Sequence, residues 1–121
     1  MSVQEVSELT LRILAVLKTH EDVAVEQRFG GNIQVWLEEL GDTHSTKASV
    51  RRVLRQLRRA GYVREDTFLN REVVRHCYTL TAEGNELLRH NIGVWQDRQD
   101  CLRRTIDTLT QQLAAGGTHD R

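Results

Sequence analysis

The chain has 121 residues, 39% of them hydrophobic and 28% charged, which is the composition of one small domain, alone or with an extension. Its 17 basic and 17 acidic residues balance, and its longest apolar runs are too short to cross a bilayer. The N-terminus has no secretion signal and the two cysteines make no disulfide framework, so we expect a cytoplasmic protein without membrane contact.

The first predicted helix is an amphipathic segment near the N-terminus. Ser7 can cap its start, and an apolar stripe from Leu9 to Leu17 recurs at helical spacing. This helix should end near His20. The following residues, 21–28, are ambiguous and could form a short strand or a loop.

A second helix is predicted over residues 33–40. Asn32 can cap it, and Gly41 is suited to the left-handed position that ends a helix. The spacing predicts a buried apolar face made of Ile33, Trp36, Leu37 and Leu40.

Positive charge is concentrated in the next segment. Residues 45–64 contain one lysine, six arginines and no acid, which leaves a net charge of −7 on the rest of the chain. Helical spacing of the apolar residues predicts a helix at about 46–60, capped by Ser45 or Thr46 and ended by Gly61. The arginines fall on the face opposite the apolar stripe, without the acids that usually decorate a solvated helix. The pattern therefore favours contact with nucleic acid.

The periodicity then changes from helical to alternating. Two antiparallel strands are predicted, roughly 62–66 and 73–80, with a tip around Asn70 and Arg71. Thr81 can cap a last, long helix. The predicted fold class is therefore mainly α with a small β-hairpin: a winged helix-turn-helix over residues 1–80, followed by a long C-terminal helix.

In a winged helix the basic helix enters the major groove of double-stranded DNA. Arg52 is the first candidate for base recognition, because arginine pairs bidentately with guanine, and the other arginines are expected to contact phosphates. The tip of the hairpin is a candidate for the minor groove or the backbone, or is a plain polar turn. The predicted DNA-binding residues are Ser45, Thr46, Lys47, Ser49, Arg51, Arg52, Arg55, Arg59, Asn70 and Arg71.

The last helix carries a heptad pattern that predicts a homodimer through a coiled-coil-like helix over 81–115, with a disordered tail at 116–121. Arg98 would face Arg103 of a partner in a parallel pair, which favours antiparallel or crossed pairing. The predicted interface residues are Leu88, Ile92, Trp95, Gln99, Leu102, Ile106, Leu109 and Leu113.

Two stretches of the sequence resemble the PadR family of bacterial winged-helix transcription regulators. One is the run L-x-x-L-x-x-x-G-Y-V from Leu54 to Val63, and the other is Y-x-L-T-x-E-G-x-x-L-L from Tyr78 to Leu88. The resemblance implies a dimeric repressor whose C-terminal helices form the dimer. With two basic helices, such a dimer would bind an inverted repeat in DNA.

Other functions remain open at this stage. Trp36 and Trp95 could line a pocket for a small-molecule effector, although tryptophans more often serve packing. The chain could instead be a winged-helix protein-interaction module, or a non-specific DNA-organising protein of a plasmid or phage. We find no phosphate loop, nucleophile elbow or paired carboxylates, so we expect no enzymatic activity, no cofactor and no metal.

Overall fold

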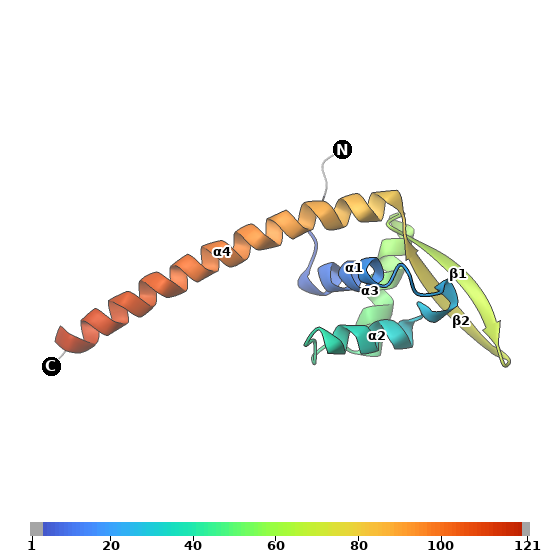
Figure 1. Cartoon of the computed structure of the whole chain (residues 1–121), viewed down its shortest axis with the longest axis horizontal. Helices are drawn as coiled ribbons and strands as arrows, with labels where there is room; N and C mark the ends of the chain where they lie inside the picture. The colour runs from blue at the N-terminus through green and yellow to red at the C-terminus, as the bar shows by residue number, and fades with distance from the viewer. Residues whose placement is uncertain (1–3, 120–121) are drawn as a thin grey trace. The chain divides into compact units, whose positions relative to one another are not determined.

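The structure is a computed structural model that describes residues 4–119, with side chains as far as residue 116. Within these residues no helix is long and apolar enough to cross a membrane. The fold is mainly helical with one antiparallel hairpin and a long C-terminal helix, as predicted (Figure 1). The elements are α1 (Glu8–Thr19), η1 (Val25–Gln27), α2 (Gly30–Glu39), α3 (Lys47–Arg59), β1 (Val63–Asn70), β2 (Val73–Leu80) and α4 (Ala82–His119).

The chain divides into two compact units, residues 1–91 and 92–121. The division lies within α4 and not at 80/81, where we expected it. The physical reason is that Leu87, Leu88 and Asn91 are buried in the first unit, with exposures of 1%, 5% and 0%. Leu88 therefore belongs to the core of its own subunit, and its assignment to the dimer interface was wrong.

In the core of the first unit, the apolar stripes of α1, α2 and α3 pack together with residues at the base of the hairpin and at the start of α4. α1, α2 and α3 pack against one another, and β1 and β2 lie side by side (Figure 1). Burial of each large apolar side chain contributes roughly 1.5–3 kcal/mol. The side chains with 0–1% exposure are Ile13, Leu14, Val16, Leu17, Ile33, Leu37, Leu54, Cys77, Leu87 and Asn91.

α1 begins and ends as predicted. The Thr10 amide donates to the Ser7 hydroxyl at 3.2 Å, which confirms Ser7 as the N-cap. Arg12 forms an ion pair with Glu8 one turn earlier, at 3.0 Å.

The start of α2 differs from the prediction. The helix begins at Gly30 after Phe29, whose extended backbone pairs with Cys77 of β2 in an isolated bridge. Because this pairing sets where the chain turns, Asn32 lies inside the helix and its side-chain amide donates to the Gln27 carbonyl at 2.7 Å. Leu40, expected on the buried face, is 56% exposed.

Residues 21–28, which the sequence left ambiguous, contain the short helix η1. Arg28 at the end of this segment forms hydrogen bonds with β2. The Arg28 guanidinium donates to the carbonyls of Glu21 and Val23 and to the Thr79 hydroxyl. The Tyr78 amide donates back to the Arg28 carbonyl at 3.1 Å. This cover explains why Cys77 and Tyr78 are both buried although they point to opposite faces of the strand.

β1 is longer than predicted, because its outer half is specified by pairing and not by its own pattern. The register runs without interruption from Val63 opposite Leu80 to Asn70 opposite Val73. The turn is made by Arg71 and Glu72, with φ of 51° and 68°. Both residues therefore occupy the left-handed region that a two-residue hairpin turn of this type requires.

α4 begins at a tight junction with the turn between α3 and β1. Thr81 caps the helix, as predicted, by accepting from the Gly84 amide, and its hydroxyl donates to the Gly61 carbonyl at 2.7 Å. The helix continues through Gly116, where we expected a disordered tail, and ends at His119. Residues 120 and 121 of that expected tail lie outside the described residues.

Candidate nucleic-acid interface

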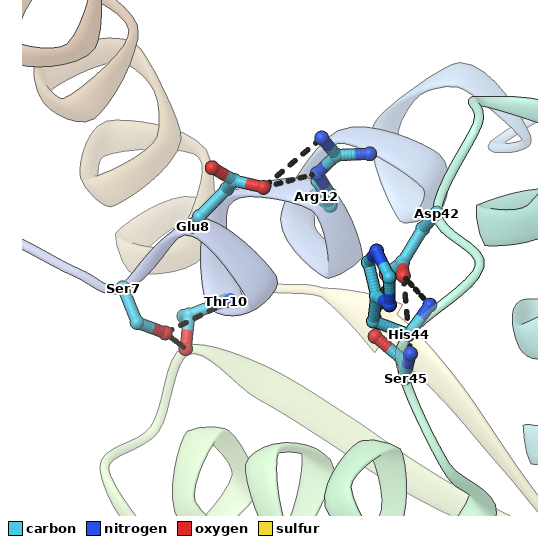
Figure 2. A network of polar contacts seen from close by, with 7 residues as sticks. All are labelled: Ser7, Glu8, Thr10, Arg12, Asp42, His44 and Ser45. Carbon is cyan, nitrogen blue, oxygen red and sulfur yellow. Dashed lines mark hydrogen bonds and ion pairs between the residues drawn. The ribbon is translucent and has the colours of Figure 1, made fainter.

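The turn between α2 and α3 is organised by one carboxylate. Asp42 accepts hydrogen bonds from the amides of His44 and Ser45, at 3.0 and 3.1 Å, and from the Ser45 hydroxyl (Figure 2). The Ser45 hydroxyl bond, followed by the two amides and the charge of Arg12, holds the pKa of Asp42 below its usual value. This carboxylate fixes the chain just before α3 begins.

The first turn of α3 is closed by a reciprocal capping box. The Ser49 amide donates to the Thr46 hydroxyl at 3.1 Å, and the Thr46 amide donates to the Ser49 hydroxyl at 2.9 Å. Thr46 is therefore the cap, and the Ser45 hydroxyl is engaged with Asp42. The Thr46 and Ser49 hydroxyls thus accept from backbone amides, and the Ser45 hydroxyl donates to the Asp42 carboxylate.

The outer face of α3 is exposed and positive. Val50, Val53, Leu54 and Leu57 are buried, so at about 100° per residue Arg52 and Arg59 point directly away from the core. Among the described residues no acid forms an ion pair with Arg51, Arg52, Arg55 or Arg59. The predicted basic face therefore exists and is not neutralised by acids.

A groove of about 750 Å³ lies between α3, the N-terminal end of α2 and the hairpin. Four of the predicted DNA-binding residues line it, Lys47, Arg51, Arg55 and Arg59, whereas Arg52 does not. The remaining residues of its lining are Phe29, Gly30, Gly31, Gln34, Val50, Leu54, Arg58, Glu65, Val74, Arg75, His76 and Tyr78.

The hairpin side of this groove holds groups that the sequence analysis missed. Glu65 lies between Arg58 and His76, with its carboxylate oxygens 3.6 Å from Arg58 Nη1 and 3.0 Å from His76 Nδ1. Burial, followed by the charge of Glu65 and a hydrogen bond to it, raises the pKa of Tyr78. The guanidinium of Arg75 stacks on Phe29, 4.1 Å from the ring centroid.

Arg58, Glu65 and His76 were not predicted as a group because they lie on three different elements, α3, β1 and β2, and come together only in the fold. Arg58 lies in the basic window 45–64, but the window pattern alone gives it no separate role. Glu65 and His76 become neighbours only when β1 pairs with β2, where they lie on the same face of the ribbon. The alternation of β2 was a usable signal for His76, and no comparable signal marked Glu65.

The predicted hairpin-tip residues lie outside the groove. Asn70 and Arg71 are exposed at the end of the ribbon. Next to them, Leu69, Val73 and Val74 are 74%, 57% and 55% exposed, so the tip is more apolar than a plain polar turn.

Neither tryptophan lines the groove. In the first unit Trp36 stacks on His20, with centroids 3.8 Å apart, and packs against the core. In the second unit Arg98 lies over Trp95, 4.8 Å from the ring centroid. The effector pocket stays a prediction, as does the dimer interface, whose apolar members Ile92, Leu102, Ile106, Leu109 and Leu113 are 46–74% exposed.

The cysteines and histidines form no cluster with metal-binding geometry among the described residues. Cys77 is buried, which raises the pKa of its thiol, and Cys101 is exposed on α4.

No protein-family model and no curated protein matches the sequence. Solved structures do match. A PadR family transcription regulator from hypervirulent Clostridium difficile R20291 superposes with a TM-score of 0.68 at 14% identity, over 83% of this chain and 99% of that chain. A putative transcriptional regulator from Thermoplasma acidophilum, TA0346, gives 0.65 at 18% identity, over 83% and 92%.

The MepR–DNA complex of S. aureus gives a TM-score of 0.57 at 17% identity, over 91% of this chain and 78% of that chain. Identities this low carry the fold and leave the function to be argued from the residues. By fold, the chain is a winged helix of the kind that these regulators share.

Proposed function

We propose that the chain is a DNA-binding transcription regulator related to the PadR family. It binds double-stranded DNA sequence-specifically through α3, acts as a homodimer on an inverted repeat, and represses transcription. The observation that carries the proposal is the basic face of α3, which lines a groove against the hairpin and has four arginines without an acidic partner among the described residues.

The roles within the interface follow from which side chains line the groove. Arg52 points directly outward from α3, where it can reach base edges in the major groove. Lys47, Arg51, Arg55 and Arg59 line the groove beside α3 and suit a phosphate backbone passing between the helix and the hairpin. The hydroxyls of Ser45, Thr46 and Ser49 hold the helix start in shape, which is a supporting role.

The fold comparisons support this class of function. The matching structures include a PadR family transcription regulator and a MepR–DNA complex. The exposed heptad face of α4 supports a dimer, because an unpaired apolar stripe on a helix is stabilised by a second copy. Two α3 helices separated by about 34–36 Å would meet successive turns of the major groove.

The test is selection from a pool of random duplex DNA at two salt concentrations, with sequencing of the retained fraction. The proposal predicts an inverted repeat. If Lys47, Arg51, Arg55 and Arg59 of each subunit contact phosphates, the slope of log K against log salt should be about −7. Single-stranded DNA of the same composition is the control.

Two outcomes would favour the other functions considered. Retention of DNA without any consensus would indicate a DNA-organising protein. Absence of retention at low salt would contradict DNA binding and favour a protein-interaction module, for which the exposed apolar residues at the hairpin tip, Leu69, Val73 and Val74, would be the first surface to test.

A further inference from the structure

Glu65 is the one acid among the described residues that line the basic groove. It lies on β1 and faces the groove together with its cross-strand neighbours on β2. Its side chain is 19% exposed, whereas Arg58 and His76, which flank it, are 53% and 55% exposed. The Glu65 carboxylate therefore lies deeper than the two side chains that flank it.

Each carboxylate oxygen has its own partner. Oε1 lies 3.6 Å from Nη1 of Arg58, and Oε2 lies 3.0 Å from Nδ1 of His76. Tyr78, buried below, forms a hydrogen bond with the same carboxylate. Glu65 thus occupies, with respect to Arg58, the position that an oxygen of a phosphate would take.

We propose that Glu65 is a built-in competitor of the DNA phosphate, which lowers affinity for duplex DNA of any sequence. The inference rests on the proposed DNA-binding function. A phosphate entering the groove must displace the carboxylate from Arg58 and meets its negative charge. The cost is the same for every sequence, so it lowers the affinity for specific and non-specific duplex DNA by the same factor and leaves their ratio unchanged.

The chain contains a matched control in the adjacent residue. Asp66 follows Glu65 on β1, so its side chain points to the other face of the ribbon, and it pairs with Arg64 at 3.2 Å outside the groove. Glu65→Gln and Asp66→Asn each remove one negative charge with little change in side-chain size, on opposite faces of the ribbon. Circular dichroism melts check that both variants fold.

The measurement is the affinity of wild type, Glu65→Gln and Asp66→Asn for a mixed-sequence duplex at fixed pH and about 0.1 M salt. Glu65→Gln should bind at least about fivefold more tightly, with a steeper salt dependence, because each phosphate contact contributes a slope of about 0.9. Asp66→Asn should change affinity by less than about twofold, since its charge is screened from the groove.

A second comparison tests whether Arg58 is the group that Glu65 holds. Arg58→Gln should weaken binding by less than about twofold in the wild type, where Arg58 is engaged with Glu65, and by about fivefold in the Glu65→Gln background. An equal loss in both backgrounds would overturn the competitor role.

The outcomes separate this inference from the function on which it rests. If the wild type binds duplex DNA and Glu65→Gln binds no more tightly than Asp66→Asn, the inference is wrong and the proposed function stands. Weaker binding by Glu65→Gln would overturn it as well and make Glu65 a positioning residue for Arg58. If none of the three proteins binds duplex DNA, the proposed function fails and this inference fails with it.

Discussion

Gly84 lies in the first turn of α4, where that helix meets the backbone of Tyr62. A Cβ at this position would lie 2.0 Å from the Tyr62 carbonyl oxygen, which itself accepts from the Thr81 amide. Gly84→Ala should therefore destabilise the first unit by about 2–4 kcal/mol, because backbone at a helix junction cannot move aside cheaply. Urea unfolding followed by circular dichroism measures the loss.

Gly93, further along the same helix, is the matched control. A Cβ there meets nothing within 4 Å, so Gly93→Ala should leave stability unchanged or raise it by about 1 kcal/mol. Equal effects of the two substitutions would show that helix propensity, and not the contact with Tyr62, explains the glycine in the T-x-E-G motif.

The free energy of unfolding of the first unit should depend on pH through Asp42. Its pKa is lowered in the folded state, mainly by the Ser45 hydroxyl, so its contribution to stability is present above its unfolded pKa of about 3.9 and is lost as pH falls through the folded value. Asp42→Ala should cost about 1–2 kcal/mol near neutral pH, where the carboxylate accepts its hydrogen bonds.

The difference between wild type and Asp42→Ala should shrink in urea melts below about pH 4. Asp22→Ala removes an exposed acid from a loop and serves as the control for net charge. A stability difference that stays constant down to pH 2–3 would contradict the role given to the Asp42 carboxylate.

At the scale of the element, the hairpin carries strain at its tip. Arg71 and Glu72 both have positive φ, which costs a residue with a Cβ about 1–2 kcal/mol. Glu72→Gly and Arg71→Gly should each raise the melting temperature, because glycine relieves that cost by roughly 0.5–1 kcal/mol after its own entropy is counted.

The two glycine variants should differ in DNA binding. If the hairpin contacts the DNA backbone or minor groove, Arg71→Gly loses a cation and should bind several-fold more weakly, whereas Glu72→Gly should not. Comparable affinities of both variants and the wild type for duplex DNA would show that the hairpin tip does not contribute to binding.

Two substitutions in α3 should distinguish base recognition from phosphate binding. Arg52→Ala should reduce affinity for the selected operator by about 1–3 kcal/mol and relax the preference at one base pair. Arg59→Ala should weaken operator and random duplex alike and reduce the salt slope by about one per subunit. If both substitutions leave binding unchanged, α3 does not lie in the major groove.

The helices were predictable where one face carries a continuous pattern. The stripes of α1 and α3 gave their bounds to within a residue or two, because burial at helical spacing is local information. The start of α2 was not predictable in this way, because it depends on Phe29 pairing with Cys77 far along the chain. The outer half of β1 likewise depends on its partner strand.

The sequence predicted which charged residues belong to the candidate site, but not the contacts that they make. The acid-free window identified the arginines of α3, and their exposure follows from the position of the buried stripe. The local roles of Thr46 and Ser49, whose hydroxyls accept from backbone amides in a capping box, were not predicted as a pair, and their contact with DNA stays a prediction. Glu65 enters the site through strand pairing, which the sequence does not display.

In the whole molecule the net charge is zero, but the positive and negative charges are unevenly distributed along the chain. The window 45–64 carries +7 and the remainder −7, so a polyanion is attracted to one surface and repelled elsewhere. If the proposed function holds, such asymmetry would orient the encounter with DNA and limit contact through the acidic surface. A dimer would present two such surfaces, so the affinity for an inverted repeat should depend on the dimer being intact.

Leu102 tests that dependence. It lies on the heptad face of α4 and is 59% exposed, so Leu102→Glu should leave the fold of the subunit intact while placing a charge in the proposed interface. Sedimentation should give a dimer for the wild type and a monomer for Leu102→Glu, with operator affinity falling and half-site affinity preserved. Thr108→Glu adds the same charge on the opposite side of the helix and should remain dimeric. A stable Leu102→Glu dimer would show that another surface joins the subunits.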